Sequence, residues 1–374
     1  MIYFDNAATT FPKPKSVYKA VNDAIYLYGG NPGRSGHYLS RQASSIIYNC
    51  REKVAEILRG SPEGVVLTLN ATSAINIAMS VLRKNGGRVL ISSFEHNAVY
   101  RRAAAMGNFS VFDASGSDDE IMRSFTSLCG RDVGLVTCVH QSNICAKKLP
   151  INRIGAYCKK RGIPFVVDAS QSLGREELTI SECGADAVCG PSHKGLYGIQ
   201  GCGFIQFSDR RIADTSGIRT FFHGGNGVDS LESKMPDFLP ERLEAGTLPT
   251  PAAASLGAGI DYVLREGIEN IAYRESLLSK KLTEGLSVIK NAVVYGDTYG
   301  YGGTVLFNIT SSDPEKVSEY LDDNDIYVRG GYHCCPLGHR SLKTPDGGAV
   351  RVSFSAFNTE SEVDRILYVL SKYK

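Results

Sequence analysis

Two short stretches decide how this chain folds and acts: Val166-Val167-Asp168-Ala169-Ser170-Gln171 and Gly190-Pro191-Ser192-His193-Lys194-Gly195. The first is an apolar strand that ends in a carboxylate. The second follows the apolar run Ala187-Val188-Cys189 and carries a hydroxyl, an imidazole and an amine. A lysine amine forms a Schiff base with an aldehyde, and an aspartate stabilises a protonated pyridine nitrogen. Asp168 and Lys194 together therefore indicate a site for pyridoxal 5'-phosphate in an enzyme of amino-acid chemistry.

Around these stretches, apolar runs alternate with segments of helical period. We expect strands at 65–69, 88–92, 133–139 and 163–168, and helices at 73–83, 97–105 and 154–161. This alternation is typical of an α/β fold with a mainly parallel sheet flanked by helices on both faces. Ligands of such sheets bind where strands end and helices begin. Polar residues gather at those positions: Thr72, Glu95, His96, Gln141, Ser142, Asn143, Asp168, Ser192, His193 and Lys194.

The pattern changes after Arg242-Leu243-Glu244-Ala245-Gly246-Thr247, where a turn with Pro249 and Pro251 precedes a long helix. We expect helices at 252–264, 273–286, 314–324 and 360–372, strands at 303–309 and 350–354, and a Gly/Tyr-rich turn at 296–303. The chain is thus expected to form a large cofactor-binding domain over residues 15–250. A smaller α+β domain would consist of residues 1–14 and 251–374.

Composition excludes several classes of function. With 41 basic and 39 acidic residues the net charge is +2, which gives no reason to expect nucleic-acid binding. No stretch approaches the ~18 apolar residues of a membrane span, and the charge at Asp5 is not typical of a secretory signal. The ten cysteines are scattered through expected strands and helices, as reduced thiols are. We therefore expect a cytoplasmic location.

The phosphate of the cofactor needs backbone N–H groups at a helix start, together with hydroxyl donors. The segment Ala71-Thr72-Ser73-Ala74 supplies them directly after a strand, with Thr72 or Ser73 expected at the N-cap. An ordinary cap without a ligand is the alternative for this segment alone. Ser192 and His193 would add donors from the lysine loop.

With these residues, the chain resembles the class V, fold-type I pyridoxal phosphate enzymes, and among them the cysteine desulfurase and selenocysteine lyase family. The resemblance runs from Tyr3-Phe4-Asp5-Asn6-Ala7-Ala8-Thr9 to Arg351-Val352-Ser353-Phe354 and Asn358-Thr359. It implies that Lys194 carries the cofactor, that Asp168 pairs with its ring nitrogen, that Gln171 reaches its phenolic oxygen and that His96 stacks on its ring. Phosphate contacts are implied for Thr72, Ser192 and His193.

The resemblance also implies a homodimer in which Gly246 and Thr247 reach the phosphate of the neighbouring subunit. The residues alone favour a plain helix start at Ala245-Gly246-Thr247, so the expectation of a dimer rests on the resemblance.

The segment Val328-Arg329-Gly330-Gly331-Tyr332-His333-Cys334-Cys335-Pro336 resembles the compact family loop that carries the nucleophilic cysteine, which aligns with Cys334. Cys335 stands where a small residue is more usual, and it is a bystander, a resolving thiol or a second acceptor. A free thiol of pKa ~8.5 is largely protonated at neutral pH. Arg329, His333 and His339 are therefore expected to activate Cys334.

Two other interpretations of this segment remain open. One is a zinc site with the two cysteines, His333 and His339, although adjacent cysteines seldom have ligand spacing, so we expect no metal. The other is a packed Gly-rich turn without a catalytic role.

Arg351 is expected to hold the α-carboxylate of the substrate, because a guanidinium pairs with a carboxylate through two parallel hydrogen bonds. The resemblance places Asn143 nearby, over the cofactor. Asn6 of the N-terminal segment is expected to border the same pocket. Arg34 lies in the Gly-rich segment 29–36 and His37 directly follows it, and both are expected to border the pocket as well.

The sequence therefore predicts a cysteine desulfurase that converts L-cysteine to L-alanine and leaves the sulfur on Cys334 as a persulfide. Lys194 would move protons, and His96 would serve as acid or base for the substrate thiol. A selenocysteine lyase acting on L-selenocysteine and a class V aminotransferase are the alternatives on the same scaffold. A non-catalytic thiol or metal carrier is the alternative of another class. A sulfur-acceptor protein is a further expected partner.

Overall fold

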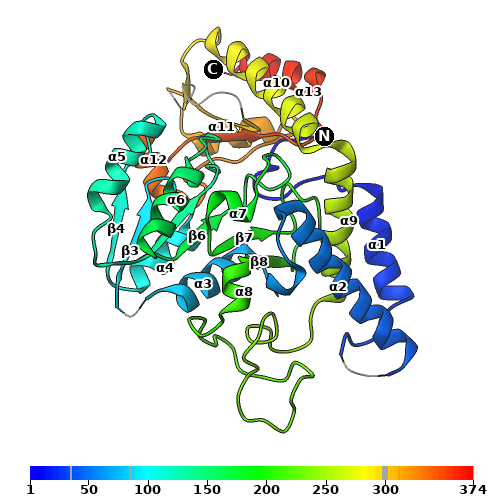
Figure 1. The fold of residues 1–374 in the computed structure, drawn as a ribbon. Coiled ribbons are helices and arrows are strands. Elements are labelled where there is room, and N and C mark those ends of the chain that lie inside the picture. The colour runs from blue at the N-terminus through cyan, green and yellow to red at the C-terminus, as the bar shows by residue number, and fades with distance from the viewer. Residues whose placement is uncertain (34–35, 85, 297–301, 311, 374) are drawn as a thin grey trace.

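A twisted seven-stranded sheet forms the centre of the computed structural model, which describes residues 1–33, 36–84, 86–296, 302–310 and 312–373 (Figure 1). Its strand order is β2-β8-β7-β6-β5-β3-β4. The strands are β2 (Val65–Thr68), β3 (Arg88–Ser92), β4 (Phe109–Phe112), β5 (Val133–Val139), β6 (Phe165–Asp168), β7 (Ala187–Pro191) and β8 (Gly203–Phe207). All neighbours are parallel except β8, which is antiparallel to both β2 and β7. The predicted α/β fold is confirmed.

Both faces of this sheet are covered by helices, which is why most positions of its strands are apolar. Val66, Ile91 and Val166 pack into one core with helices α3 (Ala71–Leu82) and α4 (Asn97–Ala105). Residues of the opposite pleat, such as Leu67 and Val167, pack into a second core on the other face. The helices of that face are α2 (Tyr38–Leu58), α5 (Asp118–Leu128), α6 (Ile151–Arg161), α7 (Ile180–Cys183) and α9 (Thr250–Glu266).

A third core joins the two ends of the chain (Figure 1). Strand β10 (Thr304–Ile309) lies between β9 (Ala292–Tyr295) and β12 (Val350–Ser353), and β1 (Ile2–Tyr3) pairs with β11 (Ile326–Tyr327). The helices α10 (Ile268–Ser287), α11 (Pro314–Asp322) and α13 (Glu360–Leu370) cover this part. The division at residues 14 and 250 stays a prediction.

The remaining elements connect these layers. Helix α1 (Lys15–Tyr26) packs against α9, and the short elements are η1 (Pro62–Gly64), α8 (Asp209–Ala213) and α12 (Pro336–Leu342). Between α8 and α9, residues 214–249 form no helix or strand and extend from the body of the molecule (Figure 1). No helix in the described ranges combines the length and apolar character that a membrane crossing requires.

Several expected elements differ from the structure. The helix expected at 73–83 begins at Ala71, because the side chain of Asn70 accepts a hydrogen bond from the backbone N–H of Ser73 and is the N-cap. The prediction of Thr72 or Ser73 as the cap is therefore wrong. The expected turn at 296–303 falls largely on residues 297–301, which lie outside the described residues.

Candidate active site

A cavity of about 240 Å³ lies where β5, β6 and β7 end and where α3 and α4 begin. This is the edge at which parallel sheets bind ligands. The residues that line it are Asn70, Ala71, Thr72, Ile75, His96, Ala98, Val139, Asn143, Asp168, Ser170, Gln171, Pro191, His193 and Lys194. Six residues predicted for the cofactor site, from four separate segments, thus meet here: Thr72, His96, Asp168, Gln171, His193 and Lys194.

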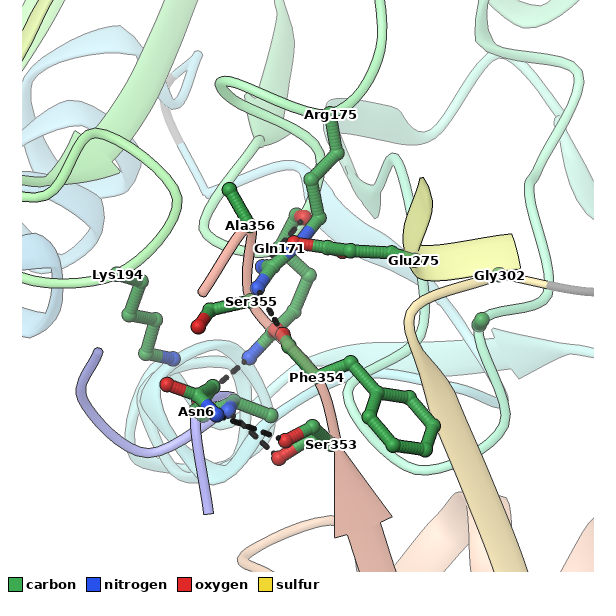
Figure 2. Close-up of polar contacts among 12 residues, drawn as sticks. Asn6, Gln171, Arg175, Lys194, Glu275, Gly302, Ser353, Phe354, Ser355 and Ala356 are labelled. Atoms are coloured by element: carbon green, nitrogen blue, oxygen red, sulfur yellow. Dashed lines mark hydrogen bonds and ion pairs between the residues drawn. The ribbon is translucent and has the colours of Figure 1, made fainter. Parts of the chain in front are cut away.

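Lys194 brings an amine into this cavity. Burial lowers the pKa of its amine to about 8, although the nearby carboxylate of Asp168 partly opposes that shift. Its side chain extends toward the N-terminal segment at Asn6 (Figure 2). An amine with this pKa is uncharged in roughly a tenth of molecules at pH 7, far more than an ordinary lysine, and the uncharged form is the one that attacks an aldehyde.

Asp168 and Gln171 stand at the end of β6. Asp168 is buried, and its Oδ1 accepts a hydrogen bond from the backbone N–H of Ser170 at 2.9 Å. The side-chain amide of Gln171 donates to the carbonyl of Ala7 at 3.0 Å (Figure 2). That bond fixes Gln171 against the N-terminal segment while it still lines the cavity.

The start of α3 offers backbone donors. Asn70 satisfies the N–H of Ser73, whereas the N–H groups of Ala71 and Thr72 have no hydrogen-bond partner among the described residues. Both residues line the cavity, and Ser73 does not. The unpaired N–H groups at this helix start are therefore those of Ala71 and Thr72, whereas the N–H of Ser73 is occupied by Asn70. Asn70 was missed, although an asparagine directly before an apolar helix is a strong capping signal.

His96 caps α4. Its Nδ1 accepts a hydrogen bond from the backbone N–H of Ala98 at 3.0 Å, so the neutral ring carries its proton on Nε2. Burial, reinforced by the charge of Lys194, lowers the pKa of His96 to about 4. His96 is thus a neutral imidazole in the wall of the cavity.

Two residues that line the cavity have buried polar atoms without a partner among the described residues: Nδ1 of His193 and Oδ1 of Asn143. Ser192, the neighbour of His193, is not in the lining, and its buried Oγ also has no partner among these residues. Burial, followed by the charge of Lys194, lowers the pKa of His193 to about 4. Because buried polar groups are normally hydrogen-bonded, these atoms indicate a polar ligand. The amine, the carboxylate and the free N–H groups fit a phosphate-bearing pyridine aldehyde.

Arg351 lies in the wall behind this cavity. It is 1% exposed, and its Nη2 forms an ion pair with Asp5 at 2.6 Å while Nη1 donates to the carbonyl of Asn143 at 3.1 Å. Its Nε is buried without a partner among the described residues. Asp5, 346 residues away in sequence, was not foreseen, because no local pattern connects the two ends of the chain.

Asn6 and His37, which were also expected at the substrate pocket, lie outside the lining of this cavity. The buried amide of Asn6 donates to the carbonyls of Tyr3 and Ser353 and so holds the N-terminal segment to β12. His37 is exposed and caps α2 through Ser40. Arg34 lies outside the described residues. Thr247 is exposed and lines a separate cavity of about 640 Å³ with Gly246.

Cys334 lies on a tight turn beside the first cavity. His333 and Cys334 have φ angles of 50° and 56°, a left-handed conformation that is uncommon for residues with a side chain. The backbone N–H of Asn97 donates to the carbonyl of Cys334 at 2.7 Å, and Asn143 donates to that of His333 at 2.8 Å. Nine of the ten cysteines are buried, whereas Cys334 is exposed.

Two histidines brace this turn in one hydrogen-bond chain. The carbonyl of Arg329 accepts from Nε2 of His333 at 2.9 Å, so Nδ1 of the neutral ring accepts from Nε2 of His339 at 3.2 Å. Nδ1 of His339 then accepts from the hydroxyl of Thr344 at 2.9 Å. Burial lowers the pKa of His339 to about 4 and that of His333 well below its usual range. At neutral pH these rings therefore add no positive charge near Cys334, and Arg329 is the charged group among the three candidates for its activation.

Cys335 faces the interior. Its thiol is fully buried and donates to the carbonyl of Phe94, and burial holds the pKa of the thiol far above its usual range. Of the three roles considered for Cys335, this environment favours the bystander. The part of the chain that the structure describes contains no group of three or more histidine, cysteine or acidic residues arranged to hold a metal ion.

Comparisons with known proteins agree with this geometry. A model of the aminotransferase class-V family matches residues 2–366. A probable cysteine desulfurase of Methanothermobacter thermautotrophicus is 31% identical over 97% of this chain and 92% of its own length. A cysteine desulfurase of Haloferax volcanii is 28% identical over 98% of this chain and 88% of its own.

Solved structures give the same result. The apo structure of a cysteine desulfurase from Thermococcus onnurineus has a TM-score of 0.88 and 29% identity, and the match covers 99% of this chain and 94% of that one. Because a family model and a relative above 30% identity both span nearly the whole chain, this chain belongs to the class-V aminotransferase family.

Proposed function

We propose that this chain is a pyridoxal phosphate-dependent cysteine desulfurase, which converts L-cysteine to L-alanine and carries the released sulfur on Cys334 as a persulfide. The observation that carries the proposal is the position of Cys334. It is the exposed cysteine of the chain, and its turn contacts Asn143 and the residue after His96. Both Asn143 and His96 line the cavity that contains Lys194 and Asp168. The names of the relatives support the same activity.

The residues that would hold the cofactor follow from the cavity. Ala71 and Thr72 would bind the phosphate with their free N–H groups, together with Ser192 and His193. Asp168 would face the ring nitrogen, and its negative charge would keep a proton there. When bound, the cofactor withdraws electrons from the substrate Cα and so weakens the bonds to that carbon.

The chain's own groups would then perform the remaining work. Lys194, whose pKa is about 8, takes the proton from Cα and returns it during formation of alanine. Arg351 orients the substrate carboxylate, for which its ion pair with Asp5 must open or be shared. Nε2–H of neutral His96 donates a hydrogen bond to the substrate sulfur. The thiolate of Cys334 attacks that sulfur, the Cβ–S bond breaks with its electron pair left on the carbon skeleton, and the sulfur stays on Cys334. Cβ and Cα then each take up a proton, which gives alanine.

The catalytic unit is proposed to be a homodimer in which Thr247 completes the neighbouring phosphate site. Thr247 is exposed and lies outside its own chain's cofactor cavity. Large apolar side chains are exposed on the same irregular segment, including Phe222, Leu231 and Phe238. Such exposed apolar groups are typical of contact surfaces. A cytoplasmic location is proposed from the buried, unpaired thiols.

The substitution Cys334→Ser tests the proposal. With L-cysteine and a reducing thiol, the wild-type protein should release alanine and sulfide in equal amounts, whereas Cys334→Ser should lose at least about 100-fold in kcat/KM and form no persulfide. Cys335→Ser is the matched control, because that thiol is buried, and should keep its turnover if it folds. Full desulfurase turnover of the Cys334→Ser variant would contradict the assignment.

The same assay separates the alternatives. An aminotransferase needs a keto-acid acceptor, whereas a desulfurase releases alanine without one. Replacing L-cysteine with L-selenocysteine reports the preference between sulfur and selenium. A non-catalytic carrier would show no lysine-bound cofactor, so borohydride reduction would leave Lys194 unlabelled.

A further inference from the structure

A second cavity, of about 820 Å³, opens on the outer side of the Cys334 turn. It is bounded by the first turns of α4, by the turn itself and by the segment from α12 to Gly347. Its volume falls within the range of small-molecule sites, roughly 300–1,000 Å³. No residue is shared between the lining of this cavity and that of the first.

The Cys334 turn forms the wall between the two cavities. On one side it is held by Asn143, which lines the first cavity, and by Asn97, which follows His96. On the other side, Cys334 itself lines the second cavity. A sulfur carried by Cys334 can therefore be received from one cavity and transferred to a thiol in the other.

The second cavity carries charges of both signs. Arg101, Arg329 and Arg340 line it, as do Glu315 and Asp346, and all five side chains are exposed. Within the described residues, none of the five forms an ion pair. Guanidinium groups without an ion-pair partner can bind the carboxylates of a ligand, and free carboxylates can bind its ammonium group.

We propose that this cavity binds the terminal sulfur acceptor, and that this acceptor is a small zwitterionic thiol with carboxylate and ammonium groups, such as a cysteine-containing peptide. The inference rests on the proposed function of Cys334. The acceptor thiolate attacks the outer sulfur of the Cys334 persulfide. A new S–S bond forms on the acceptor, the S–S bond to Cys334 breaks, and the Cys334 thiolate is regenerated. No external oxidant or reductant enters this exchange.

Glutathione is the probe, because it has two carboxylates, one ammonium group and one thiol. The enzyme is first loaded with L-cysteine without acceptor, and the alanine released reports the persulfide formed. Glutathione is then added, and formation of its persulfide is followed against glutathione concentration. We expect a rate that saturates, and a half-saturating concentration that rises about ten-fold in the double variant Arg101→Gln/Arg340→Gln.

2-Mercaptoethanol, which is uncharged, gives the comparison. Its rate with the double variant should change less than about two-fold, because it makes no ion pair in the cavity. Arg123→Gln removes an exposed arginine of α5 that lines neither cavity and should match the wild-type protein in both assays. A glutathione rate that stays linear, or equal losses with both thiols, would overturn the proposal.

A measurement that does not need turnover separates this proposal from the proposed function. S-methylglutathione cannot accept sulfur, yet it should occupy the cavity and slow alkylation of Cys334 by iodoacetamide in a saturable manner, less strongly at high salt. Absence of protection would overturn the acceptor site even if alanine forms. Protection without any alanine would instead contradict the desulfurase proposal.

Discussion

Lys194 is where burial turns an ordinary residue into a reactive one. Its pKa falls from 10.5 to about 8 because its amine is desolvated. Sequence alone predicts Lys194 and Asp168, because their strand ends are readable from the apolar runs before them. It does not predict the neutral state of His333 and His339, because burial of those rings depends on α12 packing over the turn. Charge state is thus the part of the site that the sequence reveals least.

The lowered pKa of Lys194 makes stability depend on pH in the cofactor-free protein. Between pH 8 and 10.5 the unfolded chain binds more protons than the folded one, so wild-type stability rises with pH. Below pH 8 both states are charged, and the full cost of burying the charge, about 3 kcal/mol, is present. We expect the wild type to gain about 2 kcal/mol relative to Lys194→Met between pH 7 and pH 10.

Urea unfolding of the two cofactor-free proteins at both pH values measures this change. Lys316→Met, on the exposed surface of α11, is the control and should follow the wild type. An equal difference between wild type and Lys194→Met at pH 7 and pH 10 would show that the folded-state pKa is not lowered.

At the scale of elements, the strands of the central sheet were the most predictable. β3 and β5 have the predicted bounds, because strands buried on both faces are continuous apolar runs. The first residues of the helices were harder to predict from the sequence. The start of α3 depends on one side-chain hydrogen bond from Asn70, and α2 was not foreseen, because its buried face includes Ser40 and Ala43 among larger apolar residues.

A buried ion pair connects α10 to the loop that carries Gln171 (Figure 2). Nε of Arg175 lies 2.7 Å from Oε2 of Glu275, and the same guanidinium donates to the carbonyls of Gln171 and Phe354. Both side chains are almost fully buried. Removing one partner leaves an uncompensated charge, so Glu275→Leu should lose about 3–5 kcal/mol of unfolding free energy.

The double variant Arg175→Met/Glu275→Leu should recover much of that loss, because no isolated charge remains. A double-mutant cycle by urea unfolding measures the coupling. Lys281→Met removes an exposed pair with Asp364 between α10 and α13 and should cost far less. Additive losses in the cycle would contradict a direct pairing of Arg175 with Glu275.

At the scale of the whole molecule, the chain brings its ends together: β1 pairs with β11, and Asp5 reaches Arg351. The sequence was expected to join residues 1–14 to the C-terminal part, but its patterns contain neither the register of β1 on β11 nor the ion pair of Asp5 with Arg351. The irregular course of residues 214–249 could not be predicted from the hydrophobic periodicity of the sequence either. Large apolar side chains of this segment are exposed to solvent in the described chain. Such an exposed apolar surface agrees with the proposed contact to a second copy of the chain.

The dimer proposal predicts that two inactive variants complement each other. Lys194→Ala removes the reactive amine, and Thr247→Glu places a negative charge against the phosphate. In a mixed dimer, the site with an intact Lys194 lies on the Thr247→Glu chain and receives an intact Thr247 from the other chain. Random mixing makes half the dimers mixed with one working site each, so about a quarter of wild-type activity should return.

The measurement is alanine release after the two variants are unfolded together and refolded, with mixed dimers confirmed by two different affinity tags. If Thr247 served its own chain, every site in a mixed dimer would carry one lesion and no activity would return. Mixing Lys194→Ala with Asp168→Ala is the control. Asp168 lines the same cavity as Lys194 within one chain, so each site of this mixed dimer carries one lesion and no activity should return. If the Thr247→Glu mixture stays as inactive as this control although mixed dimers form, Thr247 belongs to its own chain's site and the shared site is refuted.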